Sequence, residues 1–393
     1  MVNSDMKKRI CFIAPKFLNY IGGMETHGYA FAKWFDRKEG FEISSILTNK
    51  VVTDGIYLNA EKKVFNQKIK RILTNKYTKD INLILDNSPI ETEIYFFNST
   101  HLVPLLKELR EKRPLAKIIL RSGGTDLVAG WIGDENDPDQ DMIKNRKIAA
   151  KMINKYSDFL IVNSQFSKKR FIDIGINEDK MIVLTGGVDC NSYNPSIRNI
   201  TDNNINILHV SRFVRCKGIE NTIKAFVQAT KKTTIQSKLF MVGGGPEEKN
   251  LKRLVEDLHA NNIIEFTGLK RIEEVPDYFN ISDIFLHLPI TLKRKERGGE
   301  FNHVESMGRV FCEAAAAGIP AIAFAVGGVP EVIDNNKTGF LLKEGDIKGA
   351  SEKIINLIEN NKLRKQMGKL AREKALNKFD WKIIFKKYNK LFQ

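Results

Sequence analysis

Short apolar runs alternate with longer amphipathic segments along the first half of the chain. The runs predict buried strands at 9–14, 41–47, 93–97, 117–120, 159–162 and 181–184. Apolar residues at helical spacing predict helices at 24–35, 101–112, 140–156 and 164–174, with Ser164 as a natural N-cap. This alternation of buried strands with helices is typical of a parallel α/β sheet.

The alternating pattern stops in the middle of the chain and then starts again. Residues 186–204 have turn chemistry and little apolar periodicity, so we place a linker there. Strands are predicted again at 205–210, 239–242, 263–266, 283–288 and 319–324, and residues 346–392 read as helix with breaks near 361 and 379. The sequence therefore predicts two Rossmann-like domains facing a cleft, at 1–190 and 205–378, followed by a last helix at 379–393.

Two basic segments lie outside this pattern. Residues 56–80 are typical either of a helix that faces an anionic surface or of a solvated face. Residues 289–304 are predicted to form a long basic loop.

Length and composition favour a two-domain cytoplasmic protein. The 393 residues suit two domains, and a hydrophobic content of 42% supports real cores. The chain contains no run of eighteen apolar residues, and the apolar run near its start is too short for a signal peptide. The cysteines, at 11, 190, 216 and 312, show no metal-ligand spacing and indicate reduced thiols. We expect the protein in the cytoplasm or at the inner face of the membrane.

The net charge of +16 implies an acidic partner, which could be nucleic acid, an anionic membrane or a phosphorylated substrate. The basic residues are not interleaved with aromatic residues as in an RNA-binding motif, which argues against nucleic acid. Residues 361–393 carry 11 Lys or Arg and 2 Asp or Glu. We expect Trp381, Phe385 and Phe392 to pack inward and some of these lysines to contact anionic lipid.

Residues 305–331 carry the strongest candidate chemistry. Glu305 and Glu313 stand eight positions apart, and Gly308 and Gly318 bracket a predicted helix. A helix N-terminus offers free N–H groups and a partial positive charge, which suit a phosphate. A carboxylate inside that helix could then reach a sugar hydroxyl. The alternative is an ordinary amphipathic helix with one exposed glutamate.

Glycine turns follow several predicted strands. They occur at Gly22-Gly23, in the loop 121–126 and at 243–246, where backbone N–H groups can approach an anion. The carboxyl ends of parallel strands are where α/β sheets bind ligands. A glycine pair alone can be a plain turn, and His27 and His101 suit packing or capping better than catalysis.

Together these motifs resemble the retaining nucleotide-sugar glycosyltransferases of family 4, which have the GT-B architecture. The resemblance runs from about residue 10 to residue 381, and it implies that the last helix, at 379–393, packs back on the first domain. It rests on Glu305-x7-Glu313 followed by Gly318-x-Pro320 and the segment 327–331, on Arg212-x4-Lys217-Gly218, and on the glycine turns.

The resemblance implies a retaining, metal-independent hexosyltransferase without a cofactor. The donor would be a nucleoside-diphosphate sugar and the acceptor a hydroxyl of a sugar or lipid-linked sugar, in polysaccharide or glycolipid synthesis. Arg212 and Lys217 would stabilise the charge that develops on the departing diphosphate. Glu305 would contact the donor sugar and Glu313 the ribose. The other implied donor-binding residues are Gly23, Gly244, Met307 and Gly308.

The chain also departs from the family pattern. Gly123 stands where many relatives have a histidine, while Asp126 is kept, and both remain candidates for the sugar or acceptor side. We expect activity without that imidazole, with its space open to a substituent or filled by a neighbour such as Arg121 or His101. The lengthened loop 293–303 is similar to one in lipid-modifying mannosyltransferases. The alternatives are a degenerate transferase, a nucleotide-sugar epimerase or phosphorylase, or a basic protein that binds membranes or nucleic acid.

Overall fold

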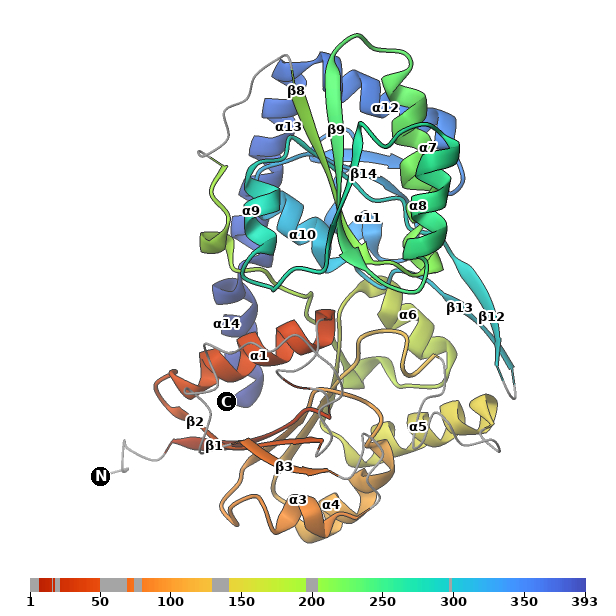
Figure 1. The fold of residues 1–393 in the computed structure, drawn as a ribbon. Coiled ribbons are helices and arrows are strands. Elements are labelled where there is room, and N and C mark those ends of the chain that lie inside the picture. Colours follow the sequence, from red (N-terminus) through yellow and green to blue (C-terminus); the bar gives the residue numbers. More distant parts are fainter. Residues whose placement is uncertain are drawn as a thin grey trace. The chain divides into compact units, whose positions relative to one another are not determined.

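The structure is a computed structural model that describes residues 7–15, 17, 22–49, 69–73, 80–128, 141–195, 204–296 and 299–393. Its elements divide into two compact units (Figure 1). The first unit contains residues 1–186, 294–301 and 385–393, and the second contains 187–293 and 302–384. The segment 294–301, which the sequence had placed in the C-terminal domain, therefore belongs to the first unit.

The first unit is built on a seven-stranded parallel sheet with the order β3-β2-β1-β4-β5-β6-β7. The strand order reverses between β1 and β4, which are neighbours in the sheet, and such a point is where open α/β sheets bind ligands. The strands are β1 (Lys8–Ile13), β2 (Phe41–Asn49), β3 (Ile69–Leu73), β4 (Ile94–Phe97), β5 (Lys117–Arg121), β6 (Phe159–Val162) and β7 (Met181–Val183).

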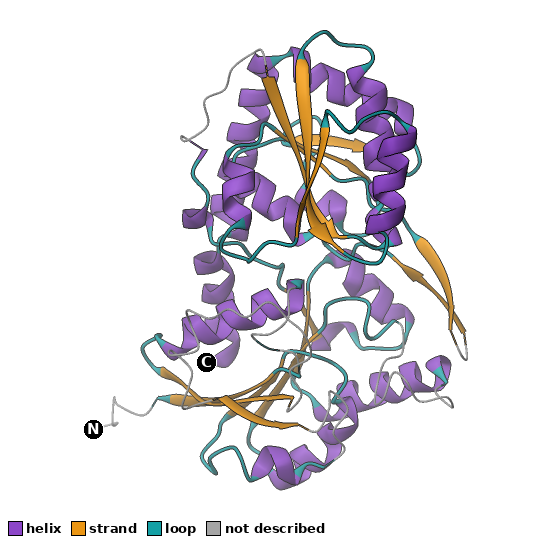
Figure 2. Ribbon diagram, viewed as in Figure 1, coloured by secondary structure: helices purple, strands orange, loops and turns teal. Residues whose placement is uncertain are grey.

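Helices lie on both sides of this sheet (Figure 2). They are α1 (Gly23–Asp36), α3 (Asn82–Leu85), α4 (Leu106–Lys112), α5 (Met142–Tyr156) and α6 (Gln165–Asp173). Side-chain caps start two of them. The Asp141 carboxylate accepts from the backbone N–H groups of Ile143 and Lys144, and the Ser164 hydroxyl accepts from that of Ser167 at 3.0 Å. The N-cap prediction for Ser164 is thus confirmed.

The last helix, α14 (Trp381–Phe392), starts in the second unit, and its residues from 385 belong to the first. Its aromatic side chains pack on α1, with Phe392 5.0 Å from Phe35 between ring centroids. The Tyr388 hydroxyl lies 2.9 Å from His27 Nε2. At the end of the helix, Lys117 Nζ donates to the carbonyl of Leu391 at 2.8 Å, a favourable place for a cation.

The second unit repeats the arrangement with a six-stranded parallel sheet, order β10-β9-β8-β11-β14-β15. Its order reverses between β8 and β11. The strands are β8 (Asn204–Arg212), β9 (Gln236–Gly244), β10 (Ile264–Gly268), β11 (Ile284–Leu286), β14 (Ala321–Phe324) and β15 (Gly339–Leu342). Both sheets therefore follow the doubly wound order, and the predicted α/β fold of two Rossmann-like domains is confirmed.

The helices of the second unit again cover both faces of their sheet (Figure 1). They are α7 (Ile219–Thr230), α8 (Glu248–Asp257), α9 (Val275–Asn280), α10 (Arg309–Ala316), α11 (Val329–Val332), α12 (Ile347–Glu359) and α13 (Asn361–Lys374). A π-helical turn, Ala375–Phe379, precedes α14. The predicted breaks near 361 and 379 are thus confirmed.

Both basic segments that the apolar pattern left unassigned contain strands. Within 56–80, residues 69–73 form the edge strand β3, and 56–68 and 74–79 lie outside the described residues. The prediction of a loop over 289–304 was wrong, because β12 (Leu292–Glu296) and β13 (Gly299–His303) form a two-stranded sheet. One apolar side chain, that of Phe301, anchors this sheet in the core of the first unit. One buried side chain produces no alternation of apolar and polar residues, so the sequence pattern did not predict these strands.

Candidate functional site

The end of β8 and the turn after it present two cations at the carboxyl edge of the second sheet. Arg212, the last residue of β8, is exposed and lies opposite Gly244, the last residue of β9. A single 3-10 turn, Arg215–Lys217, follows, and Gly218 then takes a left-handed φ of 57°. A Cβ at Gly218 would overlap the carbonyl oxygen of Leu288, so the residue after Lys217 has to be glycine.

Lys217 is held by the first of the two predicted carboxylates. Its Nζ lies 2.5 Å from Glu305 Oε2, with the side chains 21% and 15% exposed. Burial alone would raise the pKa of Glu305. The charge and hydrogen bond of Lys217, helped by His303 and by the Gly308 backbone N–H, instead bring that pKa below its ordinary value. Glu305 is therefore an ionised carboxylate that fixes the position of Lys217.

The predicted helix start at Gly308 is confirmed. Gly308 precedes α10 with a φ of 79°, and a Cβ there would come too close to the ring of Phe311. Met307 and Gly308 are both buried. The structure thus brings Lys217, Glu305 and the N-terminus of α10 together at the end of β8.

Glu313 lies one turn inside α10 and is buried, so the alternative of an exposed surface glutamate is wrong. Its Oε1 lies 2.6 Å from Arg309 Nη1. Burial raises the pKa of Glu313, and the neighbouring guanidinium of Arg309 opposes that rise. Sequence reasoning missed Arg309, although a pair of opposite charges four residues apart on a helix is a recognisable signal.

Two buried histidines lie beneath this region, and sequence reasoning missed both because each sits inside an apolar run. The ring centroids of His209, on β8, and His287, after β11, are 4.8 Å apart, and His287 also packs on Phe311 of α10. His209 Nδ1 lies 3.0 Å from the carbonyl of Leu286. A carbonyl can only accept, so Nδ1 carries the hydrogen and Nε2 accepts from Ser211 Oγ at 2.8 Å.

Both imidazoles are neutral in the folded protein. Burial lowers the pKa of His209 to about 4, against the effect of its backbone hydrogen bond, and the charge of Lys217 lowers it further. Burial, His209 and Lys217 bring the pKa of His287 well below its ordinary value. Among the described residues neither ring nitrogen of His287 has a hydrogen-bond partner. The charge of Lys217 therefore acts on a pair of uncharged rings.

This neutral pair predicts acid sensitivity. Between pH 6.5 and about 4 the unfolded chain binds protons that the folded protein does not, so the free energy of unfolding should rise with pH across that window. At pH 5.5 each imidazole should lower the free energy of unfolding by about 1–1.5 kcal/mol relative to pH 7.5. His287→Leu should remove about half of the pH dependence in urea unfolding, and His259→Asn, at an exposed position, should leave it unchanged. Identical pH profiles for His287→Leu and wild type would contradict the neutral pair.

The carboxyl edge of the first sheet brings Gly23 and Gly123 into one neighbourhood. Gly23 begins α1, and the carbonyl of the next residue, Met24, accepts from Asn98 Nδ2 at 3.0 Å. A Cβ at Gly123 would lie 3.1 Å from Met24 Cγ and Sδ. Arg121, which is buried, directs its Nη1 to the same sulfur at 2.7 Å. The first neighbour that a side chain at Gly123 would meet is therefore Met24, which Arg121 also contacts.

Asp126 is buried and accepts hydrogen bonds from two loops, one after β4 and one after β5. Its carboxylate accepts from Thr100 Oγ1 and from Ser122 Oγ, both at 2.5 Å. The carbonyl of Gly123 accepts from Asn163 Nδ2 at 3.1 Å. These contacts fix the backbone around Gly123.

We expect Gly123→His to change the choice of donor sugar or to slow the reaction, more than it changes nucleotide affinity. The new side chain has to displace Met24, whose flexible chain can move at modest cost. The measurement is a donor panel on wild type, Gly123→His and the control Gly123→Ala, which introduces the same Cβ contact without an imidazole. Faster transfer by Gly123→His from every donor would mark the glycine as a catalytic defect.

The described residues contain no cluster of three or more His, Cys, Asp or Glu side chains that could hold a metal ion. None of the helices in the described part of the chain is long and apolar enough to span a membrane. Gly23, Gly123 and Asp126 belong to the first unit, and the other seven predicted site residues belong to the second.

Fold and site together define a protein with two doubly wound α/β units and with Arg212, Lys217 and the start of α10 near the end of β8. Residues 194–374 match the model of the family described as glycosyl transferases group 1. An uncharacterized glycosyltransferase of Methanocaldococcus jannaschii is 27% identical, and the match covers 99% of both chains. A Corynebacterium glutamicum protein described as a GDP-mannose-dependent monoacylated alpha-(1-6)-phosphatidylinositol monomannoside mannosyltransferase is 26% identical over 77% of both chains.

Solved structures support the same fold. The crystal structure of Anabaena HepE in complex with UDP matches with a TM-score of 0.72 and 21% identity, over 98% of this chain and 99% of that one. The chain is a glycosyltransferase with the GT-B fold, and its residues 194–374 are similar to the glycosyl transferases group 1.

Proposed function

We propose that the protein is a retaining, metal-independent hexosyltransferase that needs no cofactor. It moves a sugar from a nucleoside diphosphate to a hydroxyl acceptor in cell-envelope polysaccharide or glycolipid synthesis. The observation that carries this proposal is the grouping of Lys217, Glu305 and the α10 N-terminus beside the end of β8, where Arg212 lies.

In this reaction the protein mainly has to stabilise the negative charge that develops on the departing diphosphate. The bond from the sugar's anomeric carbon to the diphosphate oxygen breaks, and a bond to the acceptor oxygen forms on the same face. The acceptor's proton passes to the departing phosphate. Arg212 binds phosphate oxygens in a bidentate way, and Lys217 acts as a point charge next to them. Both stabilise the charge as it develops.

Backbone and carboxylate groups hold the rest of the donor. The N–H groups at Met307 and Gly308 meet the diphosphate at the start of α10, and Gly23 and Gly244 let other backbone approach it closely. Glu305, an anion already fixed by Lys217, orients the donor sugar. Glu313 binds the ribose hydroxyls.

The acceptor is a sugar or lipid-linked sugar bound by the first unit, where Asp126 positions the Gly123 loop. Two relatives support this class of acceptor by their names. One is the phosphatidylinositol mannoside mannosyltransferase above, and the other is a putative colanic acid biosynthesis glycosyltransferase of Escherichia coli, 26% identical over 60% of this chain. We place the protein in the cytoplasm or on the inner face of the membrane, with anionic lipid as a partner and without nucleic acid.

The test starts with a thermal-shift panel of UDP, GDP, ADP and TDP. A nucleotide at a hundred times its Kd should stabilise the native state by about 2.7 kcal/mol. Transfer from sugars of the nucleotide that binds is then assayed with and without EDTA, and the anomeric configuration of the product is read by NMR. Nucleotide binding without transfer would favour a degenerate transferase or an epimerase. An inverted product, or a reaction that EDTA abolishes, would contradict the mechanism.

A further inference from the structure

The outer face of α5 carries a row of lysines with an isoleucine on each side. The helix has five Lys or Arg residues and no acidic residue. Its inner face packs in the core of the first unit. At about 100° per residue, Ile143 and Ile148 lie roughly 140° apart around the helix, and all four lysines fall between them. These lysines are Lys144, Lys147, Lys151 and Lys155.

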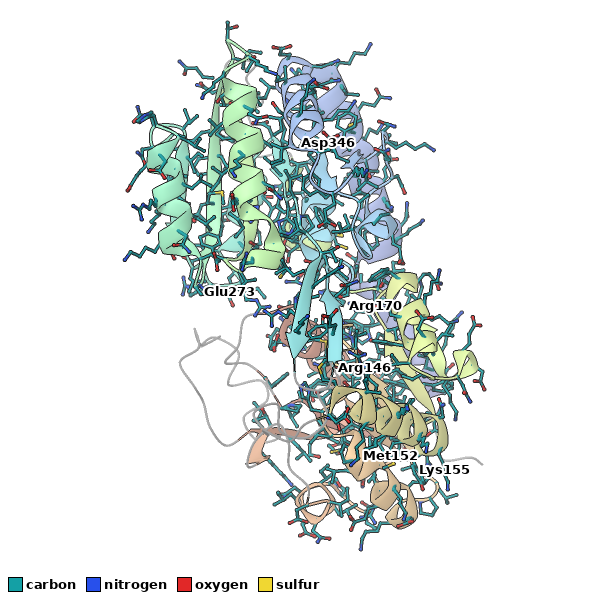
Figure 3. All side chains as sticks on the ribbon, turned by 90° about the vertical axis from the view of Figure 1, so that its right-hand side faces the viewer. Arg146, Met152, Lys155, Arg170, Glu273 and Asp346 are labelled. Atoms are coloured by element: carbon teal, nitrogen blue, oxygen red, sulfur yellow. The ribbon has the colours of Figure 1, made fainter. Side chains whose placement is uncertain are left out.

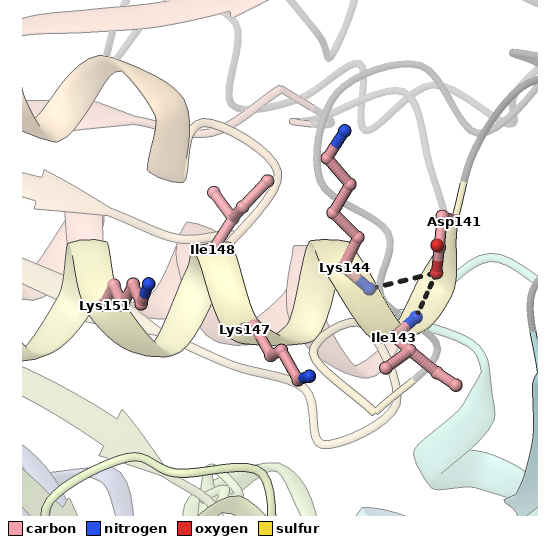
Figure 4. Close-up of a pocket in the computed structure, with 6 residues that line it drawn as sticks. All are labelled: Asp141, Ile143, Lys144, Lys147, Ile148 and Lys151. Atoms are coloured by element: carbon pink, nitrogen blue, oxygen red, sulfur yellow. Dashed lines mark hydrogen bonds between the residues drawn. The ribbon is translucent and has the colours of Figure 1, made fainter.

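A hollow on this face is lined mainly by lysines. Lys144, Lys147, Lys151 and both isoleucines line a hollow of about 330 Å³, and Figure 4 shows Lys144 and Ile148 on one side of it and Ile143 and Lys147 on the other. Among the described lining residues Asp141 is the one acid, and its carboxylate caps the helix. Within the ranges that the structure describes, no carboxylate pairs with the three lysines.

The charge continues beyond Ile143. Arg146 lies on α5 and Arg170 on α6, and both are labelled in Figure 3. Burial and the neighbouring charge of Arg146 lower the pKa of Arg170, and the charge of Asp173 opposes them. Like charges held close together in this way favour the binding of an anion between or beside them. Arg146 also donates to the carbonyl of Glu300, so β13 lies beside this end of the helix.

The two isoleucines indicate what kind of anion fits. Ile143 is 50% exposed and Ile148 36% exposed, although a free phosphate or a nucleic acid backbone would need only the cations. A membrane surface offers phosphate groups with apolar chains below them. Lysines can spread their stems along such a surface while isoleucines enter the boundary between headgroups and acyl chains.

We propose that the outer face of α5 is the surface by which this protein docks on a membrane rich in anionic phospholipid. The proposal rests on the membrane partner of the proposed function and is independent of the sugar-transfer chemistry. It assigns docking to α5 in place of the lysines of the C-terminal helix.

The experiment is co-sedimentation of the full chain with vesicles of phosphatidylcholine, alone or mixed with phosphatidylglycerol, at low and high salt. The first variant is Lys144→Gln/Lys147→Gln/Lys151→Gln. Its charge-matched control is Lys386→Gln/Lys387→Gln/Lys390→Gln, which removes three exposed lysines from α14. The α5 variant should lose roughly a hundredfold in partition to the anionic vesicles, and the α14 variant should lose severalfold at most.

A second variant keeps the charge. Ile143→Ser/Ile148→Ser should remove the binding that persists at high salt and leave the electrostatic part in place. Nucleotide-induced thermal shifts, measured on every variant, show that each is folded and report on the donor site separately. Equal losses for the two lysine variants, a larger loss for the α14 variant, no effect of the isoleucine pair, or no binding of wild type at low salt would each overturn the proposal.

Discussion

Replacing Arg212 or Lys217 with alanine should lower kcat/KM by about 2–4 kcal/mol, a hundredfold or more, while the fold survives. Each cation supplies charge stabilisation that is stronger in the transition state than in the bound donor, because the leaving diphosphate gains charge as the glycosidic bond breaks. Steady-state kinetics with the preferred donor measure the effect. The control is Arg215→Ala, which removes an exposed cation from the same 3-10 turn and should change kcat/KM little.

The lysine needs a second control because of its ion pair. Lys217→Ala leaves Glu305, which is 15% exposed, without its cation, so stability should fall together with activity. The double variant Lys217→Met/Glu305→Gln removes both charges and should recover stability without recovering transfer. Recovery of transfer in the double variant, or near-normal rates in both single variants, would remove the two cations from the mechanism.

The parts of the fold that could be predicted are those with a local physical cause. Buried strands in parallel sheets are short apolar runs, and most of them could be located from the sequence in both units. The edge strands β3 and β15 were not predicted. Gly218 and Gly308 have positive φ angles, which glycine adopts without strain. Their places in the two motifs therefore follow from the backbone conformation alone.

The contacts that define the site could not be predicted in the same way. Lys217 and Glu305 are 88 residues apart, and no local pattern says that they form a pair. Met24, at the start of α1, lies beside Gly123, which follows β5, and this contact between residues about 100 positions apart depends on the strand order. His209 and His287 look like ordinary core positions until the sheet places them side by side.

The two glutamates should separate binding from transfer. Glu313→Ala should raise the Kd of the bare nucleoside diphosphate by about 10- to 100-fold, because the ribose is common to donor and product and a hydrogen bond to a charged group contributes about 1.5–3 kcal/mol. Glu305→Ala should leave that Kd within a few-fold of wild type and lower transfer, because Lys217 stays available to the diphosphate while the sugar loses its contact. Isothermal titration with the diphosphate that stabilises the protein measures both.

Arg309 complicates the reading of Glu313→Ala, since loss of the carboxylate leaves that guanidinium unpaired against the helix. The double variant Arg309→Met/Glu313→Met removes the stranded charge. If the ribose contact is real, nucleotide binding stays weak in the double variant. If binding returns to the wild-type Kd, the unpaired charge of Arg309 caused the loss of binding in Glu313→Ala. Glu313 would then have a structural role and no contact with the ribose. Equal loss of nucleotide affinity in Glu305→Ala and Glu313→Ala would show that the division of roles between the two carboxylates is wrong.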